Sequence, residues 1–258
     1  MSQAQLIAVP LLSIEAVPAP ALLHLCDYGR ELPVFGSAWL YRSEMDCPWT
    51  LIDTGTEDPQ AANVGRPAER CWRAAPLVDR LAQHGVRPEQ IADVVLTHLH
   101  HDHCGSIERF PAARWHVPAV EWEFVVDPRN ADLATDPLYP QTLFSRMARH
   151  GVRPLADGDR PVAGLRTIHL GGHTVGSMAV ELIDPAGEVY LVLGGDVMPL
   201  YENLARGIPP GTLWHWGECR RALQWLAAYA VPVLPSHDPL VMQKYPQGVI
   251  LDGACAPA

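Results

Sequence analysis

The sequence has no long apolar run. Nowhere in its 258 residues is there a stretch of the ~18 consecutive apolar residues that a membrane-spanning helix needs. The first 25 residues are apolar, but no Lys or Arg precedes the apolar part, and the prolines Pro10, Pro18 and Pro20 interrupt it. We therefore expect a strand-and-loop lead-in at this end of the chain, and neither a signal peptide nor a membrane span.

Clustered positive charge is also missing. The 19 Lys and Arg residues are scattered, and the formal net charge is -10. Binding to nucleic acid or to an anionic membrane surface requires grouped cations, so neither is an expected partner.

The cysteines are few and lack the spacing of a disulfide framework. No CxxC pair occurs, and the six positions are spread along the chain: Cys26, Cys47, Cys71, Cys104, Cys219 and Cys255. This usage favours reduced thiols in a cytoplasmic protein over disulfides.

The chain is long enough, and at 48% hydrophobic residues apolar enough, to bury a large core. Apolar runs at 49–55 and 91–98 predict buried strands, and the helical spacing at 74–85 predicts a helix that joins them. The order strand, helix, strand indicates a layered α/β fold. We expect a single domain over residues 1–258, with the polar, Pro-rich stretch at 127–161 as a cap-like insertion.

Seven potential metal ligands lie at the ends of expected strands: His98, His100, Asp102, His103, His173, Asp196 and His237. The first four fall in "LTHLHHDHCGS" (96–106), directly after the strand at 91–98. The other three end strands expected within 164–184, at 188–196 and, as the last strand, at 231–238. Because the carboxyl ends of strands in a layered α/β fold meet at one edge, we expect these loops to converge.

The spacing of the first group allows two metal centres. One metal could take His98 and His100, and the other could take Asp102 and His103, which leaves each centre two ligands short of a tetrahedral shell. One histidine each from the remaining loops, and a carboxylate that bridges, would complete both shells. Imidazole and carboxylate ligands without thiolate favour zinc, with manganese, iron or cobalt as alternatives.

Some of these residues also have ordinary structural explanations. Asp102 could cap a loop, and Asp196 could be a turn residue. Cys104 is expected to be a small buried residue beneath the loop. Asp53, in "LIDTG", could orient a metal-binding histidine or make a plain strand-end hydrogen bond. Isolated histidines are expected to have no chemical role: His24, His84, His150 and His215.

The motifs "THLHHDHCG", "GGHTVGS", "LGGD" and "PSHD", in this order, resemble those of the metallo-β-lactamase superfamily over about residues 35 to 240. The resemblance implies an αββα sandwich, in which two mixed β-sheets lie between outer helices and a dinuclear site lies at one edge. It assigns His98, His100 and His173 to the first metal. It assigns Asp102, His103 and His237 to the second metal and makes Asp196 the bridge.

Within that superfamily the chain resembles the N-acyl homoserine lactonases and related small-lactone hydrolases. Those enzymes commonly place a tyrosine three residues after the bridging aspartate, whereas this chain has Pro199 there. Tyr201 is a candidate replacement. The segments "LYPQTLFSRM", "VMPLY" and "TLWHWG" could line an apolar pocket or could instead be core or dimer contacts.

The sequence thus predicts a metal-dependent hydrolase that opens a lactone ring by attack of a metal-bound hydroxide, with Asp102 moving the proton. Its expected partner is a small lactone or ester, and a homodimer is compatible with the sequence. The alternatives are a thioester hydrolase like glyoxalase II, an iron-dependent oxidoreductase on the same ligands, and a non-catalytic metal-binding protein. A glyoxalase II-like enzyme is disfavoured because no helical domain with basic residues follows residue 240.

Overall fold

The computed structural model describes residues 4–135 and 137–252, and it contains two mixed β-sheets. The first is an 8-stranded sheet with the order β12-β1-β2-β3-β5-β6-β7, in which β4 pairs with β1. Its strands are β1 (Gln5–Pro18), β2 (Glu31–Arg42), β3 (Trp49–Ile52), β4 (Arg73–Ala74), β5 (Ile91–Val95), β6 (Arg114–Pro118), β7 (Val152–Leu155) and β12 (Val249–Asp252).

The second sheet is 4-stranded, with the order β11-β10-β9-β8. Its strands are β8 (Leu165–His169), β9 (Met178–Ile183), β10 (Val189–Leu193) and β11 (Val233–Leu234). The α-helices are α1 (Gln60–Asn63), α2 (Leu77–Gln83), α3 (His101–Cys104), α4 (Ala119–Val126), α5 (Gln141–His150), α6 (Tyr201–Arg206), α7 (Trp216–Ala227) and α8 (Leu240–Lys244).

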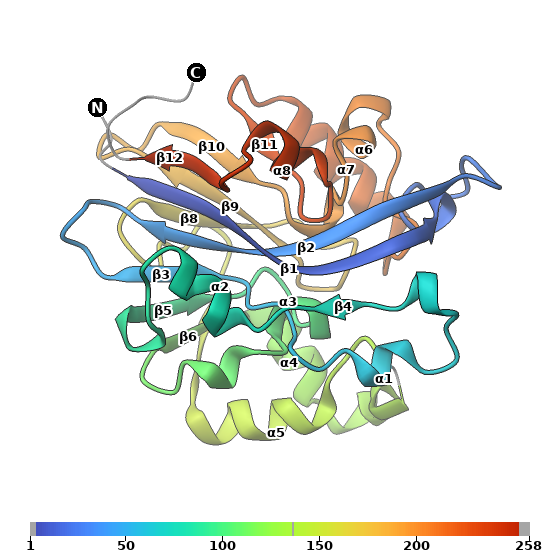
Figure 1. Cartoon of the computed structure of the whole chain (residues 1–258), viewed down its shortest axis with the longest axis horizontal. Coiled ribbons are helices and arrows are strands. Elements are labelled where there is room, and N and C mark those ends of the chain that lie inside the picture. Colours follow the sequence, from blue (N-terminus) through green and yellow to red (C-terminus); the bar gives the residue numbers. More distant parts are fainter. Residues whose placement is uncertain (1–3, 136, 253–258) are drawn as a thin grey trace.

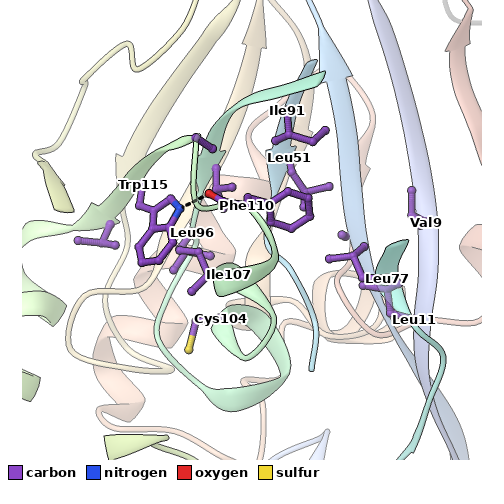
Figure 2. Packing of buried hydrophobic residues seen from close by; sticks show 14 of the residues in the cluster. Val9, Leu11, Leu51, Leu77, Ile91, Leu96, Cys104, Ile107, Phe110 and Trp115 are labelled. Carbon is purple, nitrogen blue, oxygen red and sulfur yellow. Dashed lines mark hydrogen bonds between the residues drawn. The ribbon is translucent and has the colours of Figure 1, made fainter. Parts of the chain in front are cut away.

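Helices lie outside the two stacked sheets, which gives four layers (Figure 1). Three clusters of buried side chains hold these layers together. One cluster packs α2, α4 and α5 against the large sheet, and Figure 2 shows part of it. A second cluster fills the space between the two sheets, and a third packs α7 on the outer face of the small sheet. The sequence-based expectation of an αββα sandwich of two mixed sheets is therefore confirmed.

The alternation of side chains along the strands explains this layering. Along β1, Ile7 and Val9 face the helices, whereas Leu6 and Ala8 face the small sheet. Successive residues of a strand point to opposite faces, so a strand between two layers must be apolar on both. Strand β9, "MAVELI", is buried at every residue for the same reason.

The structure corrects the sequence analysis at the C-terminal end of the chain. The stretch 231–238 was expected to be the last strand, but β11 covers only Val233–Leu234, and β12 follows it. Pro232 and Pro235 flank β11 and cannot donate a backbone hydrogen bond to a sheet, which keeps this strand short. The long strand β2 was not anticipated either.

The stretch 127–161 contains a 3-10 segment (Pro128–Thr135), α5 and β7, and β7 pairs in parallel with β6. Helix α5 ends at His150, and Gly151 follows it with a φ of 90°, a conformation that residues with a side chain rarely adopt. One position of the stretch, 136, lies outside the described residues. The role of this stretch as a cap, and the single domain over 1–258, stay predictions.

The structure describes the helices and most of the cysteines, on which the expectations about a membrane span and about disulfides depend. No helix in 4–135 and 137–252 is both long and apolar enough to cross a membrane. The cysteines that the structure describes are all free: Cys26, Cys47, Cys71, Cys104 and Cys219. Cys255 lies outside the described residues.

Candidate metal centre

The seven potential ligands named from the sequence converge at one edge of the sandwich. They lie in the segment that follows β5, in the β8–β9 loop, and in the segments that follow β10 and β11. Strands β8, β10 and β11 run in the same direction, because β9 is antiparallel to both β8 and β10 while β11 is parallel to β10. Their carboxyl ends therefore share an edge. All seven side chains are buried: His98, His100, Asp102, His103, His173, Asp196 and His237.

Three of the histidines present nitrogen atoms to one another. His100 Nδ1 lies 3.1 Å from His98 Nε2 and 3.1 Å from His173 Nε2. Ligands about 2.0–2.1 Å from a tetrahedral zinc ion are roughly 3.3 Å apart, so the spacing of these nitrogens matches a shared cation. His173 comes from a different sheet than the other two, so this group joins the two sheets.

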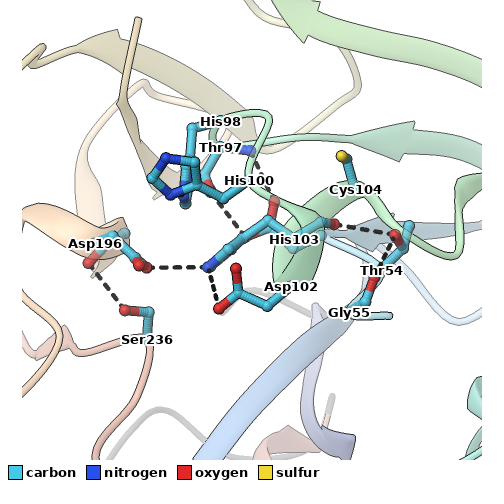
Figure 3. A network of polar contacts seen from close by, with 12 residues as sticks. Thr54, Gly55, Thr97, His98, His100, Asp102, His103, Cys104, Asp196 and Ser236 are labelled. Carbon is cyan, nitrogen blue, oxygen red and sulfur yellow. Dashed lines mark hydrogen bonds and ion pairs between the residues drawn. The ribbon is translucent and has the colours of Figure 1, made fainter. Parts of the chain in front are cut away.

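A second group lies beside the first, and Asp196 is in reach of both (Figure 3). Asp196 Oδ1 lies 3.2 Å from His103 Nε2, and Asp196 Oδ2 lies 3.0 Å from His237 Nε2. Asp102 Oδ2 lies 3.7 Å from His103 Nε2 and 3.6 Å from His237 Nε2. On the other side, Asp196 Oδ2 is 3.5 Å from His173 Nε2, which places the carboxylate between the two groups.

The far side of three histidine rings is hydrogen-bonded to an acceptor. His173 Nδ1 lies 2.8 Å from the carbonyl of Thr212, and His237 Nδ1 lies 2.8 Å from the carbonyl of Phe35. An Nδ1–H that donates to a carbonyl leaves the lone pair on Nε2, the atom that faces the other ligands. His103 is held in the same way by the carboxylate of Asp53, at 2.9 Å.

Asp53 combines this contact with an unusual backbone. Its φ is 58°, in the left-handed region that residues other than glycine adopt infrequently. The carboxylate accepts hydrogen bonds from the Thr97 backbone N–H and the Thr97 hydroxyl, both at 2.8 Å, as well as contacting His103. Both sequence-based explanations of Asp53 are therefore present at once, since it fixes a neighbouring loop and orients a potential ligand.

The electrostatics divide the histidines into two sets. Burial holds the pKa of His98, His100 and His173 below the ordinary value, so these rings are neutral at pH 7. Burial also acts to lower the pKa of His103 and His237, but the carboxylates beside them outweigh it and raise both pKa values. In return, His103 and His237 lower the pKa of Asp196, although its burial opposes this.

The residues present fit a pair of metal ions. Three neutral imidazole nitrogens that converge within hydrogen-bond distance cannot all donate to one another, whereas one cation can accept all three lone pairs. Two carboxylates and two further histidines form the adjoining group. A donor set of imidazole and carboxylate suits zinc.

Glu121, which was not predicted from the sequence, ties two ligand-bearing segments together from α4. Its side chain is fully buried, and burial raises the pKa of its carboxyl group. Its oxygens accept from the backbone N–H of Leu99 at 3.1 Å, the N–H of Gly176 at 2.9 Å and the hydroxyl of Thr174. A Cβ on Gly176 would lie 2.5 Å from Glu121, so glycine is needed there. The only sequence signal for this residue was an acid, one of two, in a largely apolar helix.

Three of the residues expected to be structural make packing or capping contacts. Cys104 is buried in the core beneath the loop, where its thiol lies 3.4 Å from the Leu99 carbonyl. His150 stacks on Trp115 with ring centroids 3.6 Å apart, and His215 caps α7 by accepting from the Glu218 N–H. None of these side chains belongs to the groups of potential metal ligands in the described part of the chain.

A cavity of about 150 Å³ lies over the ligands. Its wall includes Leu138, Pro199 and Thr212, one from each of the three segments expected to supply a pocket. Trp214 is instead exposed, and the aromatic rings Tyr139 and Phe144 belong to the core.

Tyr201 is not among the residues that line this cavity. It packs against the buried clusters on either side of the small sheet, and its hydroxyl is buried without a hydrogen-bond partner among the described residues. The candidate replacement for the missing tyrosine therefore does not contact the cavity over the ligands.

The sequence and the fold have counterparts in known proteins. The N-acyl homoserine lactonase AttM of Rhizobium johnstonii is 29% identical over 177 residues, which cover 65% of this chain and 66% of AttM. The aligned segments span 23% to 66% of the length of the curated relatives.

Among solved structures, a quorum-quenching N-acyl homoserine lactone lactonase has a TM-score of 0.75 at 16% identity, covering 95% of this chain and 96% of its own. The dizinc quorum-quenching lactonase AidC has a TM-score of 0.69 at 13% identity, covering 92% of this chain and 87% of its own. At such identities the likeness shows the fold alone. The family model of the metallo-beta-lactamase superfamily matches residues 32–233, and with this match over most of its length the chain belongs to that superfamily.

Proposed function

We propose that the chain is a dinuclear metal-dependent hydrolase that opens a lactone ring. The observation that carries this proposal is the convergence of seven buried histidine and aspartate side chains into overlapping groups, with Asp196 in reach of both sides. The curated relative AttM is called an N-acyl homoserine lactonase, and AidC is called a dizinc lactonase. Their names support a lactone as the substrate and zinc as the metal.

We assign the ligands by these groups. His98, His100 and His173 would hold one ion. Asp102, His103 and His237 would hold the other ion, and Asp196 would contact both. When bound, two such ions supply Lewis acidity toward a carbonyl oxygen and lower the pKa of a water molecule.

We assign to Asp102 the transfer of a proton to the departing ring oxygen. Burial acts to raise the pKa of its carboxyl group, but His103, His101 and His237 outweigh burial and lower it. The carboxylate is therefore ionised at neutral pH and can accept a proton. It lines the cavity over the ligands, where the departing ring oxygen would take that proton up.

The wall of this cavity favours a compact, apolar group next to the reacting bond of the substrate. Ile14, Val34 and Leu138 supply part of that wall, and such apolar side chains would limit the access of bulk water to the reacting carbonyl. Pro199 presents no side-chain donor to it. The oxyanion must then be stabilised without the tyrosine found in many lactonases of this superfamily.

The test is a hydrolysis panel on protein of known metal content. Zinc-loaded protein is assayed with N-hexanoyl homoserine lactone, a simple γ-lactone, an aryl ester and a thioester, beside the variant Asp196→Ala. We expect about two ions per chain and opening of the lactones, with a strong loss in the variant. Cleavage of only the thioester or the aryl ester at full loading would assign the protein to the alternative ester-hydrolase function. No hydrolysis at full loading would overturn the proposal.

A further inference from the structure

A larger cavity adjoins the one over the ligands. Its volume is about 1000 Å³, against about 150 Å³ for its neighbour, and Arg66 and His101 line both. A substrate whose reacting bond lies over the ligands can therefore extend past these two side chains into the larger space. His101 is the one histidine of the "HLHHDH" stretch that belongs to none of the ligand groups formed by the described residues.

Three buried polar groups on the wall of the larger cavity lack partners. Both ring nitrogens of His101, the Ser106 hydroxyl and Gln141 Nε2 have no hydrogen-bond partner among residues 4–135 and 137–252. His101 and Ser106 are only 6% and 5% exposed. An unpaired buried polar group costs about 1–3 kcal/mol, so a ligand in this cavity that offered hydrogen-bond partners to these side chains would remove that cost.

One of the arginines on the wall of the larger cavity is not paired with an acid among the described residues. Arg109 is paired with Glu57, and Arg146 Nε lies 3.1 Å from Glu108. Arg66 makes no ion pair with the described residues, and it is shared by the two cavities. The remaining acid, Asp58, is exposed and accepts a hydrogen bond from the Gln60 N–H.

We propose that the larger cavity binds a carboxylate at the far end of the substrate's acyl part. This inference rests on the proposed lactone hydrolysis and names the substrate class. Arg66 supplies the positive charge, and Ser106, Gln141 and one nitrogen of His101 supply donors for the carboxylate oxygens. A long apolar acyl tail would leave these groups unpaired, so it is a poor occupant.

The experiment compares two lactones of similar reach that differ in the group at the end of the acyl chain. N-succinyl-L-homoserine lactone ends in a carboxylate, whereas N-pentanoyl-L-homoserine lactone ends in a methyl group. We expect the zinc-loaded protein to favour the succinyl compound by about 10-fold or more in kcat/KM. In Arg66→Gln and Gln141→Leu that ratio should fall toward one. Arg153→Gln removes an exposed arginine outside both cavities and serves as the matched control with an unchanged ratio.

A second measurement separates this inference from the proposed function. Binding of the ring-opened compounds, N-succinyl- and N-pentanoyl-L-homoserine, is measured by titration calorimetry and requires no turnover. If neither lactone is hydrolysed but the succinyl compound binds more tightly in an Arg66-dependent way, the result contradicts the proposed lactone hydrolysis and supports the carboxylate site. If both lactones are opened but the ratio of their kcat/KM values does not exceed one, or rates rise with the length of an apolar tail, the result contradicts the carboxylate site and supports the proposed lactone hydrolysis. Equal binding of the two compounds, without hydrolysis of either lactone, contradicts both proposals.

Discussion

Asp53 orients the ring of His103, a potential metal ligand. Its carboxylate fixes the ring of His103 and the Thr97 backbone together, and its left-handed φ aims the carboxylate at both. Asn tolerates the same φ but carries no charge. We expect Asp53→Asn to lower zinc affinity by about 10 to 100-fold with the fold intact, because a hydrogen-bonded carboxylate strengthens a histidine ligand. Chelator competition on the purified variant measures the affinity.

The control is a second carboxylate–histidine pair, which belongs to none of the ligand groups among the described residues. Asp93 Oδ1 lies 2.7 Å from His116 Nε2, and both side chains are buried. Asp93→Asn removes the same kind of contact and should leave zinc affinity unchanged. Equal losses in the two variants would mean that Asp53 acts through general destabilisation and not through His103.

The two sets of histidines predict proton release on metal uptake. The pKa of His103 is raised well above its ordinary value, so this ring carries a proton at pH 7 in metal-free protein, whereas His98 is neutral. A metal ligand must be deprotonated. Zinc binding at pH 7 should therefore release at least one proton per chain, seen as a heat that depends on the ionisation enthalpy of the buffer. A heat that is the same in all buffers would contradict the assignment, and His103→Ala should release fewer protons.

Helix α4 joins the segments that present the ligands. Its buried Glu121 accepts hydrogen bonds from the segment after β5 and from the β8–β9 loop. In Glu121→Gln, an amide NH₂ replaces one accepting oxygen and faces donors. We expect a loss of about 1.5–3 kcal/mol in the free energy of unfolding of metal-free protein, because hydrogen bonds to a charged group are lost. Urea denaturation measures this change.

Glu123→Gln is the matched control, because it changes an exposed acid on the same helix. Its free energy of unfolding should stay within about 0.5 kcal/mol of the parent. If Glu121→Gln is as stable as this control, Glu121 does not clamp the two segments.

The contrast between the ligands and Glu121 shows what local patterns can reveal. His98 to His103, Asp196 and His237 follow apolar runs in the sequence, and strand ends of this kind meet at one edge. Glu121 sits in "AVEWEFVV", where an acid on a helix ordinarily faces water. Its burial is a consequence of the loops packed over α4, which no local pattern encodes. Strand β12 was missed for a related reason, since it is defined by its pairing with β1.

Metal binding should stabilise the sandwich as a unit, because the ligands come from segments attached to both sheets. Zinc at 1,000 times its Kd stabilises a folded protein by about 4 kcal/mol per site. For a chain of this size that corresponds to a rise of roughly 8 to 16 °C in Tm. Calorimetric scans with zinc and with chelator measure the difference. His103→Ala should gain less, and identical Tm values with and without zinc would contradict a site shared by the two sheets.

Because β1 pairs with β12, this part of the large sheet cannot form until β12 has been synthesised. Gln5 pairs with Asp252, so this part of the large sheet joins segments from opposite ends of the described chain. Contacts this distant in sequence raise the contact order, which slows folding because a long loop must close before the contact forms. Until residue 252 leaves the ribosome, the outer edge of β1 at Gln5 to Ile7 has no strand to bind. In a nascent chain such an open edge is a site for aggregation, so we expect expression at low temperature or with chaperones to increase the soluble yield.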